Sequence, residues 1–271
     1  MFHVQTVDHL DDPRLLPYRT MKQQRDHFNQ RLFVAEGEKV VRRLLESNLV
    51  VISLALPEKW LAPMAPFLEP RPENVAVFVV EKTELEKLTG FSMYQGLLAV
   101  GRIPDSASLD VVLATSAQPY LLAAVDGLNN SENLGALVRN CAAFGVQALL
   151  VGETCSSPYL RRAVRSSMGT IFTLPVVETT CLAQSLRTLR QHHVWSVAAH
   201  PHAYPRSLSQ ARLAPDACLV FGSEGFGLSA DVLAACDDQV AIPMQAGVDS
   251  LNVASASAAF LYEAARQRAQ A

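Results

Sequence analysis

The sequence predicts an α/β protein in which a parallel sheet is covered by helices on both faces. Beyond residue 110, short apolar stretches alternate with helix-length segments, and several stretches are apolar throughout. A segment rich in Pro, Ser and Asp, Gly101–Asp110, separates this region from an earlier patterned one. The 271-residue chain is therefore expected to form two domains, at residues 1–105 and 106–271.

The first region has the pattern of a small α/β unit. Gly90 is expected to end a short helix there, because glycine just past the last periodic residue commonly stops a helix. Helical periodicity occurs in residues 16–30, 37–48 and 83–90, and strand-length apolar segments occur in residues 49–57, 73–82 and 96–103.

The second region alternates more regularly. Ligands of parallel sheets bind in the loops that follow the carboxyl ends of strands, which selects Asp126–Arg139, Gly222–Gly227 and Met244–Asn252 as candidate loops. Strands are expected at residues 119–127, 146–152, 174–178, 194–200, 217–223 and 239–244, and helices at 132–145, 157–169, 181–193, 228–237 and 250–270.

The composition excludes several classes of protein. Hydrophobic residues make up 49% and charged residues 18%, which is typical of a packed chain and not of a disordered one. No apolar run is long enough to span a bilayer and no signal peptide is visible, so no membrane partner is expected. Five irregularly spaced cysteines without a CxxC motif indicate reduced thiols in a cytoplasmic protein. His192, His193, His200 and His202 lack a further ligand at suitable spacing, so no metal site is expected.

The first loop contains "NLGALVRN". Asn133 or Ser131 can cap a helix that starts near Leu134, and Arg139 lies one turn beyond Gly135 on the same face. A helix amino terminus with an arginine one turn inside can hold a phosphate or a sugar hydroxyl. Taken alone, the loop is explained more simply by an ordinary cap and a solvated arginine.

The second loop, "LVFGSEGFGLS", combines glycines with an acid. A glycine-rich loop usually holds phosphate, but Glu224 would repel one and no lysine follows the last glycine. The acid suits a cationic group or one that offers hydrogen-bond donors, such as S-adenosylmethionine with its sulfonium, ammonium and ribose hydroxyls. Alternatively, Glu224 caps the helix that starts near Leu228.

The third loop leads from "VAIPM" to Ser250, Leu251 and Asn252 at a helix start. Small residues from Ala254 to Ala259 follow, and they allow close packing against another element or another subunit. In isolation, "SLN" is also explained as the capped start of a tightly packed helix.

Together and in this order, the three loops resemble the SpoU (TrmH) family of RNA 2'-O-ribose methyltransferases, within the SPOUT superfamily. The resemblance rests on "NLGALVRNCAAFG", "LVFGSEGFGLS" and "IPMQAGVDSLNVASASAAFLYEA", with "RRAVRSSMGTIFTLPV" between them, and it spans roughly Tyr120–Arg266. The first region, with "FVAEGEKVVRRLL" and "YQGLLAVGRIP", resembles the ribosomal-protein-like α/β extension that binds substrate in many members.

The resemblance implies a C-terminal trefoil-knotted domain with a parallel sheet, a homodimer, and S-adenosylmethionine bound in the knot. It also implies an RNA partner, rRNA or tRNA, with rRNA favoured by the added N-terminal domain. The reaction centre would contain Asn133, Arg139, Ser250 and Asn252. The cofactor site would contain Gly222, Glu224, Gly225, Ile242, Met244, Leu251 and Asn252, with the glycines providing room for a close backbone approach.

Two features of the family pattern bear on mechanism. Members often have proline shortly before the first asparagine, whereas this chain reads "NNSEN" at Asn129–Asn133, so a looser loop is expected. Arg139 is often described as the base, but guanidinium groups stay protonated at neutral pH. We expect Arg139 to hold a phosphate and to favour the developing alkoxide, while the proton leaves late to water or phosphate.

Local patches must supply RNA recognition, because the formal net charge is −3. Phosphates attract basic clusters and unpaired bases stack on aromatic rings, although solvated helix faces and core aromatics show the same patterns. The candidates are Arg14, Arg19, Lys22, Arg25, Arg31, Arg42, Arg43, Arg161, Arg162 and Arg165 for phosphates, and Phe28, Phe33 and Tyr94 for bases.

Two other functions compete with methyl transfer. A catalytically silent RNA-binding protein could keep the same fold, but the intact set of Asn133, Arg139, Ser250 and Asn252 argues against it. A nucleotide-binding enzyme could use the glycine loop for phosphate, but Glu224 and the missing lysine argue against that.

Overall fold

The computed structural model describes residues 2–7, 9–23, 27, 29–93, 96–201, 206–213 and 215–270. The chain forms two compact units, residues 1–105 with 159–173, and residues 106–158 with 174–271. No helix within the described ranges is long and apolar enough to cross a bilayer.

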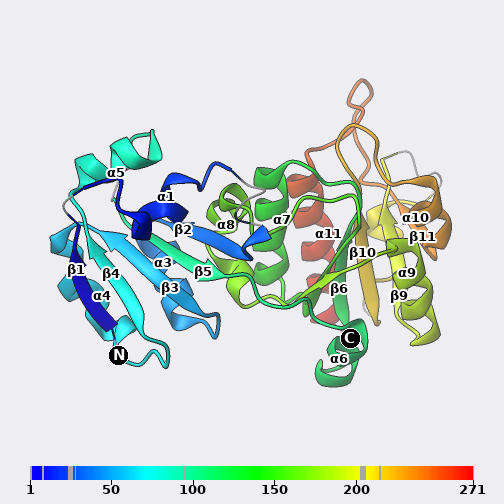
Figure 1. The fold of residues 1–271 in the computed structure, drawn as a ribbon. Helices are drawn as coiled ribbons and strands as arrows, with labels where there is room; N and C mark the ends of the chain where they lie inside the picture. Colours follow the sequence, from blue (N-terminus) through cyan, green and yellow to red (C-terminus); the bar gives the residue numbers. More distant parts are fainter. Residues whose placement is uncertain are drawn as a thin grey trace. The chain divides into compact units, whose positions relative to one another are not determined.

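The second unit contains the parallel sheet that the alternating pattern predicts. Its six strands are hydrogen-bonded in the order β11-β9-β10-β6-β7-β8, and every pairing is parallel (Figure 1). The strands are β6 Leu121–Val125, β7 Ala148–Val151, β8 Val176–Glu178, β9 Trp195–Ala199, β10 Ala217–Phe221 and β11 Asp238–Val240.

Helices cover both faces of this sheet. Cys218 and Val220 of β10 point into a core cluster with α9 (Leu182–Gln191) and α10 (Ala230–Ala235). Phe221 faces the other way, where its ring meets Phe260 of α11 edge-on at 5.9 Å. On that face α11 (Val253–Arg268) packs against α7 (Ser131–Ala143) (Figure 1). The helix α6 (Leu109–Thr115) begins within the segment that the sequence suggested as a linker.

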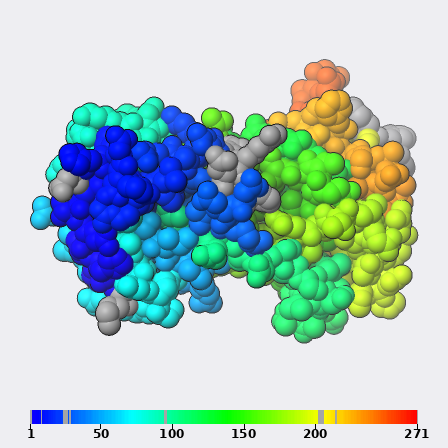
Figure 2. Space-filling view, in the orientation of Figure 1, coloured from blue at the N-terminus to red at the C-terminus, as the bar shows by residue number. Residues whose placement is uncertain are grey.

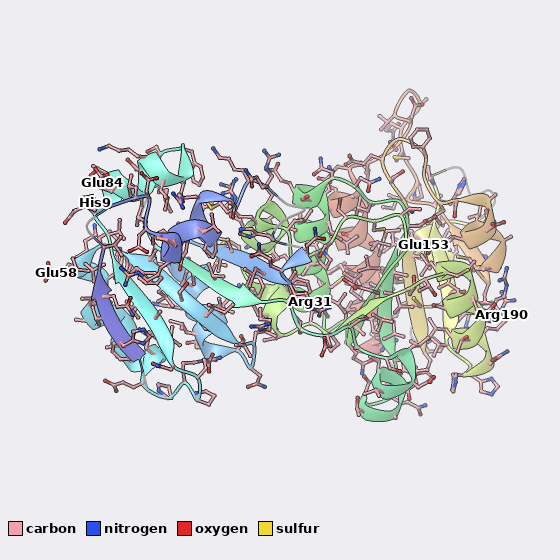
Figure 3. The ribbon with its side chains drawn as sticks, in the orientation of Figure 1. His9, Arg31, Glu58, Glu84, Glu153 and Arg190 are labelled. Carbon is pink, nitrogen blue, oxygen red and sulfur yellow. The ribbon has the colours of Figure 1, made fainter. Side chains whose placement is uncertain are left out.

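Side chains fix both ends of α9. Glu153, labelled in Figure 3, follows β7 and accepts a hydrogen bond from the Leu182 backbone N–H at 2.9 Å. Arg190, also labelled, lies in the last turn and donates to the carboxylate of Asp237, which in turn accepts from the backbone N–H of Ser196 at 2.8 Å. The edge of the sheet that carries β9 and β11 is thereby anchored to its covering helix.

The first unit is a mixed sheet with helices. Its strand order is β1-β4-β3-β5-β2, with β1, β4 and β3 parallel and β5 antiparallel to β3 and β2. The strands are β1 Phe2–Thr6, β2 Leu32–Glu36, β3 Val51–Leu56, β4 Val75–Val79 and β5 Leu98–Arg102, and the helices are α1 Leu16–Arg19, α3 Glu38–Glu46, α4 Leu61–Leu68, α5 Lys82–Thr89 and α8 Arg161–Ser166.

The expected helix over residues 16–30 is not continuous in the structure: residues 20–23 are not helical, whereas His27 and Asn29 are helical again. Only the four residues of α1 are helical in its first half, and the basic candidate Arg25 lies outside the described residues. The sequence reasoning missed β1, β2 and α4. The strand β1 is a sheet edge with mostly exposed side chains, so it lacks the apolar run that marked the other strands.

The segment 159–173 is placed differently from the expected division of the chain. It carries α8, and it belongs to the first unit although the sequence assigned it to the domain 106–271. Arg161 donates to Glu36 at 2.5 Å, and the Phe172 ring stacks on Phe33 with centroids 5.3 Å apart. Tyr159 contacts the same Phe33 ring at 5.8 Å. Half-buried charge pairing and ring packing therefore tie the segment to β2.

Candidate active site

A cavity of about 370 Å³ lies at the carboxyl ends of β9, β10 and β11. Ala199 and His200 line it after β9, and the loop 222–228 lines it after β10. The far wall comes from the segment between β11 and α11, whose residues 245–250 are exposed at the surface (orange to red in Figure 2). Six of the seven residues expected around the cofactor line this cavity, namely Gly222, Glu224, Gly225, Ile242, Met244 and Leu251.

The charge of the cavity suits a cation. Glu224 and Asp249 contribute carboxylates to the lining, and no lysine or arginine is among the lining residues in the described part of the chain. Ile242, Met244 and Leu251 add apolar surface. A phosphate group would meet two negative charges and no counter-charge, whereas a sulfonium, an ammonium or a hydroxyl donor would be favoured.

The glycine loop is closed by its own backbone. Ser223 and Gly227 exchange two backbone hydrogen bonds of 3.0 and 2.9 Å. A Cβ on Gly222 would lie 2.2 Å from the carbonyl carbon of Gly227, so a side chain there would force the turn apart. Gly222 is thus needed for the packing of the loop itself, whereas the sequence reasoning assigned the glycines to close contact with the cofactor. A Cβ on Gly225 would meet nothing within 4 Å.

Two predicted residues from two other loops, Asn133 and Asn252, both contact Glu224 in the glycine loop. The Nδ2 group of Asn133 donates to Glu224 Oε1 at 2.7 Å, and the Nδ2 group of Asn252 donates to the same oxygen at 2.6 Å. Asn252 also donates to Asn133 Oδ1 at 3.1 Å. Among the described residues, no hydrogen bond engages Glu224 Oε2. We call Asn133, Glu224 and Asn252 the amide–acid triad; it leaves one carboxylate oxygen available to a ligand.

The helix caps differ from those that the sequence suggested. Asn130, and not Asn133 or Ser131, caps α7, since its Oδ1 accepts from the N–H groups of Glu132 and Asn133 at 2.9 and 3.2 Å. Glu224 does not cap α10. Asp126 instead accepts from the N–H of Ser229 at 2.7 Å, just before that helix. Asn133 and Glu224 are therefore left for the triad.

Asn252 both caps a helix and takes part in the triad. Its Oδ1 accepts from the Ala254 N–H at 2.9 Å, which caps α11, while its Nδ2 belongs to the triad. The capping that the sequence suggested for "SLN" therefore coexists with a place in the site.

The loop that lacks the expected proline is held by side chains of the next loop. Ser156 Oγ donates to the carbonyl of Asn129 at 2.9 Å, and the Leu128 N–H donates to Cys155 Sγ at 3.3 Å. Burial raises the pKa of the Cys155 thiol, so it stays protonated and donates to the carbonyl of Val125 at 3.3 Å. These contacts replace the restraint that a proline would give, and the expectation of a looser loop finds no support in them.

Arg139 and Ser250 stand apart from the triad. Arg139 is exposed on α7, and no hydrogen bond or ion pair among the described residues engages its guanidinium. Ser250 is exposed and lines the cavity, and among the described residues no hydrogen bond joins it to the triad. The structure therefore brings Asn133, Glu224 and Asn252 together and leaves Arg139 and Ser250 accessible.

Sequence reasoning missed two positioning residues. Asn140 donates from Nδ2 to the carbonyl of Ala254 at 2.7 Å and to Ser257 Oγ at 3.0 Å, which ties α7 to the start of α11. Asp126 is buried and anchors the end of the glycine loop through Ser229. Asn140 could have been found from its seven-residue spacing to Asn133, because two helical turns place both side chains on the same face.

Many of the basic RNA candidates are already paired within the first unit. Arg31 pairs with Asp105 at 3.1 Å, and Arg43 donates to the carbonyl of Met168 at 2.7 Å. Phe33 is buried among rings and cannot stack on a base. Further pairs are Arg14–Asp12, Arg19–Asp11, Arg42–Glu38, Arg161–Glu36 and, at 3.9 Å, Arg165–Glu36. Arg162 is exposed, and Arg25, Phe28, Tyr94 and His202 lie outside the described residues.

The fold and the cavity together define a class of protein: a parallel-sheet α/β protein that binds a positively charged, phosphate-free cofactor at the carboxyl ends of its strands. The chain belongs to the SpoU rRNA Methylase family, whose model matches residues 120–262.

Relatives of known name support this assignment. An uncharacterized tRNA/rRNA methyltransferase of Mycobacterium tuberculosis is 34% identical over 97% of this chain and 92% of its own. The 23S rRNA (guanosine-2'-O-)-methyltransferase RlmB of Vibrio cholerae is 34% identical over 72% of this chain and 79% of its own.

Solved structures agree. A crystal structure of an RNA 2'-O ribose methyltransferase has a TM-score of 0.78 at 30% identity and covers 99% of this chain and 100% of its own. The SpoU methyltransferase AviRb from Streptomyces viridochromogenes, solved with AdoMet, shares the fold with a TM-score of 0.82 at 22% identity, covering 95% of this chain and 98% of its own. The protein is an RNA methyltransferase that uses S-adenosylmethionine.

Proposed function

We propose that this protein methylates a ribose 2'-hydroxyl in structured RNA, with rRNA favoured over tRNA. The observation that carries the proposal is the amide–acid triad at a cavity whose described lining residues include two carboxylates and no lysine or arginine. The 2'-O specificity of the RlmB relative and of the solved RNA 2'-O ribose methyltransferase supports the choice of atom.

The residues of the cavity fit S-adenosylmethionine. Gly222, Gly225, Ile242, Met244 and Leu251 would surround it, and the free Oε2 of Glu224 would accept a donor or face a positive charge. Asn252 would act from the rim through its bond to Glu224. The bound donor supplies a methyl group that leaves sulfur as the ribose oxygen attacks in line.

The reaction centre is proposed to combine the two asparagines with Arg139 and Ser250. Asn133 and Asn252 are held by Glu224, so their amides are oriented before substrate arrives. Arg139, which is exposed, would hold the neighbouring phosphate and favour the alkoxide that develops at the ribose. The ribose proton would leave late, to water or to that phosphate.

Several further features are proposed on the same basis. After the edge strand β11, the chain returns to pack α11 on α7 and β10, a route compatible with a trefoil knot. A homodimer, a cytoplasmic location and RNA binding by the domain 1–105 remain predictions of the family resemblance. Arg162 of α8, which is exposed and has no ion pair among the described residues, would contact phosphate, with Arg165 beside it in a 3.9 Å pair with Glu36.

The test is methyl transfer from tritiated S-adenosylmethionine to in vitro transcribed 23S rRNA and to a tRNA pool, followed by mapping of alkali-resistant 2'-O-methylated positions. Labelled 2'-O-methylribose in one rRNA position is the expected result. A protein that binds the transcript and the donor but transfers nothing would be the catalytically silent alternative, and labelling of a base would refute the choice of atom.

A further inference from the structure

The loop that holds Glu224 also carries the most exposed large hydrophobic side chain in the described part of the protein. Phe226 is 98% exposed, compared with 60% for Tyr262, which comes next. Its backbone N–H donates to Ser223 Oγ at 3.2 Å, inside the turn closed by Ser223 and Gly227. The backbone beneath the ring is therefore fixed, while the ring itself lies in solvent.

The surroundings of the ring leave both of its faces open. A Cβ on Gly225 or on Gly227, the two flanking residues, would meet no atom within 4 Å. No ring pair or cation–π contact of Phe226 occurs among the described residues. A bare aromatic ring between two glycines offers a flat surface and little else, which matches the requirements of a stacked base.

From this geometry we propose that Phe226 stacks on an unpaired base of the RNA substrate, next to the nucleotide whose ribose is methylated. The inference rests on the proposed ribose methylation and adds a positioning residue to it. Phe226 lies two residues from Glu224 and lines the donor cavity, so a base held there lies beside the reacting ribose. A stable protein interface buries about 800 Å² of each partner. The glycines on either side of Phe226 add no side-chain area to such an interface.

Three variants separate stacking from simple bulk. Phe226→Ala removes the ring, Phe226→Leu keeps apolar volume without a π-face, and Phe226→Trp keeps the π-face. We expect the KM for a 23S rRNA transcript to rise about 10-fold for the Ala and Leu variants and to stay within about 2-fold for Trp, because one stacked base contributes about a tenfold change or more in affinity. Calorimetry should show unchanged binding of S-adenosylhomocysteine in all three.

The alternative occupants give different outcomes. A drop in S-adenosylhomocysteine affinity would place the ring over the cofactor, and a change in sedimentation velocity would place it at an interface between two copies of the chain; either overturns the proposal. A Leu variant equal to wild type would also overturn it. Filter binding of the same transcript is measured in parallel. If neither the wild type nor any variant transfers a methyl group, but the Ala and Leu variants still bind the transcript more weakly, the proposed ribose methylation is refuted and the stacking role stands.

Discussion

Replacing Glu224 by glutamine tests whether the acid in the glycine loop is a receptor for positive charge. The substitution is nearly isosteric, and the remaining carbonyl oxygen can still accept from Asn133 and Asn252, which now bond Oε1 at 2.7 and 2.6 Å. The negative charge is lost, and an NH₂ group replaces the Oε2 atom that the triad leaves uncovered. Shape and hydrogen bonding within the triad therefore change much less than the electrostatics.

The size of the effect follows from the exposure of the site. A charge pair about 4 Å apart is worth about 1 kcal/mol in bulk water and about 4 kcal/mol at an effective dielectric constant of 20. Because Glu224 is exposed, the low end of this range applies. About 1.5 kcal/mol corresponds to about a 10-fold loss of affinity for S-adenosylmethionine.

Isothermal titration calorimetry measures this loss directly. Asp249→Asn is the matched control, since Asp249 also lines the cavity but takes no part in the triad; we expect its effect to stay within about 3-fold. S-adenosylhomocysteine lacks the sulfonium charge. If Glu224 faces the sulfur, the Glu224→Gln substitution should weaken the binding of S-adenosylhomocysteine less than that of S-adenosylmethionine. If Glu224 faces the ammonium, it should weaken the binding of both equally. Unchanged binding of S-adenosylmethionine to Glu224→Gln, or equal losses in the two variants, would refute a specific cation receptor at Glu224.

Three further predictions follow from named contacts. Asn252→Ala should lower the free energy of unfolding in urea by about 1 kcal/mol through loss of the α11 cap, whereas Asn252→Ser keeps a capping oxygen and should not. Both variants should lose methyl transfer. A fully active Ser variant would show that the amide bonds to Glu224 and Asn133 are dispensable. Arg139→Lys keeps the charge but loses the planar fork, so kcat/KM should fall about 10- to 100-fold while Arg187→Lys on α9 changes nothing; near-normal turnover would rule out bidentate positioning. The hydrogen bond from Arg266 lowers the pKa of Glu263 to about 2, so its contribution to stability is present above the unfolded pKa of about 4.3 and is lost as the pH falls toward 2. The urea midpoint of Glu263→Gln should accordingly fall less between pH 5 and pH 2 than that of wild type, and parallel curves would contradict the assignment.

Much of the second unit could be predicted because its signals are local. Uniformly apolar strands such as Leu121–Val125 and Ala217–Phe221 imply burial on both faces, and the structure confirms a fully parallel sheet there. The rule that places ligands at strand ends selected loops that line the cavity, whereas the individual cofactor residues were implied by the family resemblance. The convergence of Asn133, Glu224 and Asn252 could be expected only from the family resemblance, since 91 residues separate the first two.

The remaining misses have physical causes. Asn130, Ser131 and Asn133 are all competent caps by residue type, and backbone geometry alone decides among them. The edge strand β1 carries no apolar run, because its side chains are largely exposed. Nothing in the composition of residues 159–173 shows that their partners, Phe33 and Glu36, lie more than a hundred residues earlier in the chain.

The position of residues 159–173 limits how the polypeptide can be divided. The chain passes from one unit to the other at three points, after residues 105, 158 and 173. Removal of residues 1–105 would strip Tyr159 and Phe172 of the ring they pack on and leave Arg161 without its carboxylate. Grafting the N-terminal region of a relative onto this methyltransferase would therefore require transplanting the crossover segment with it, since neither part is a self-contained module.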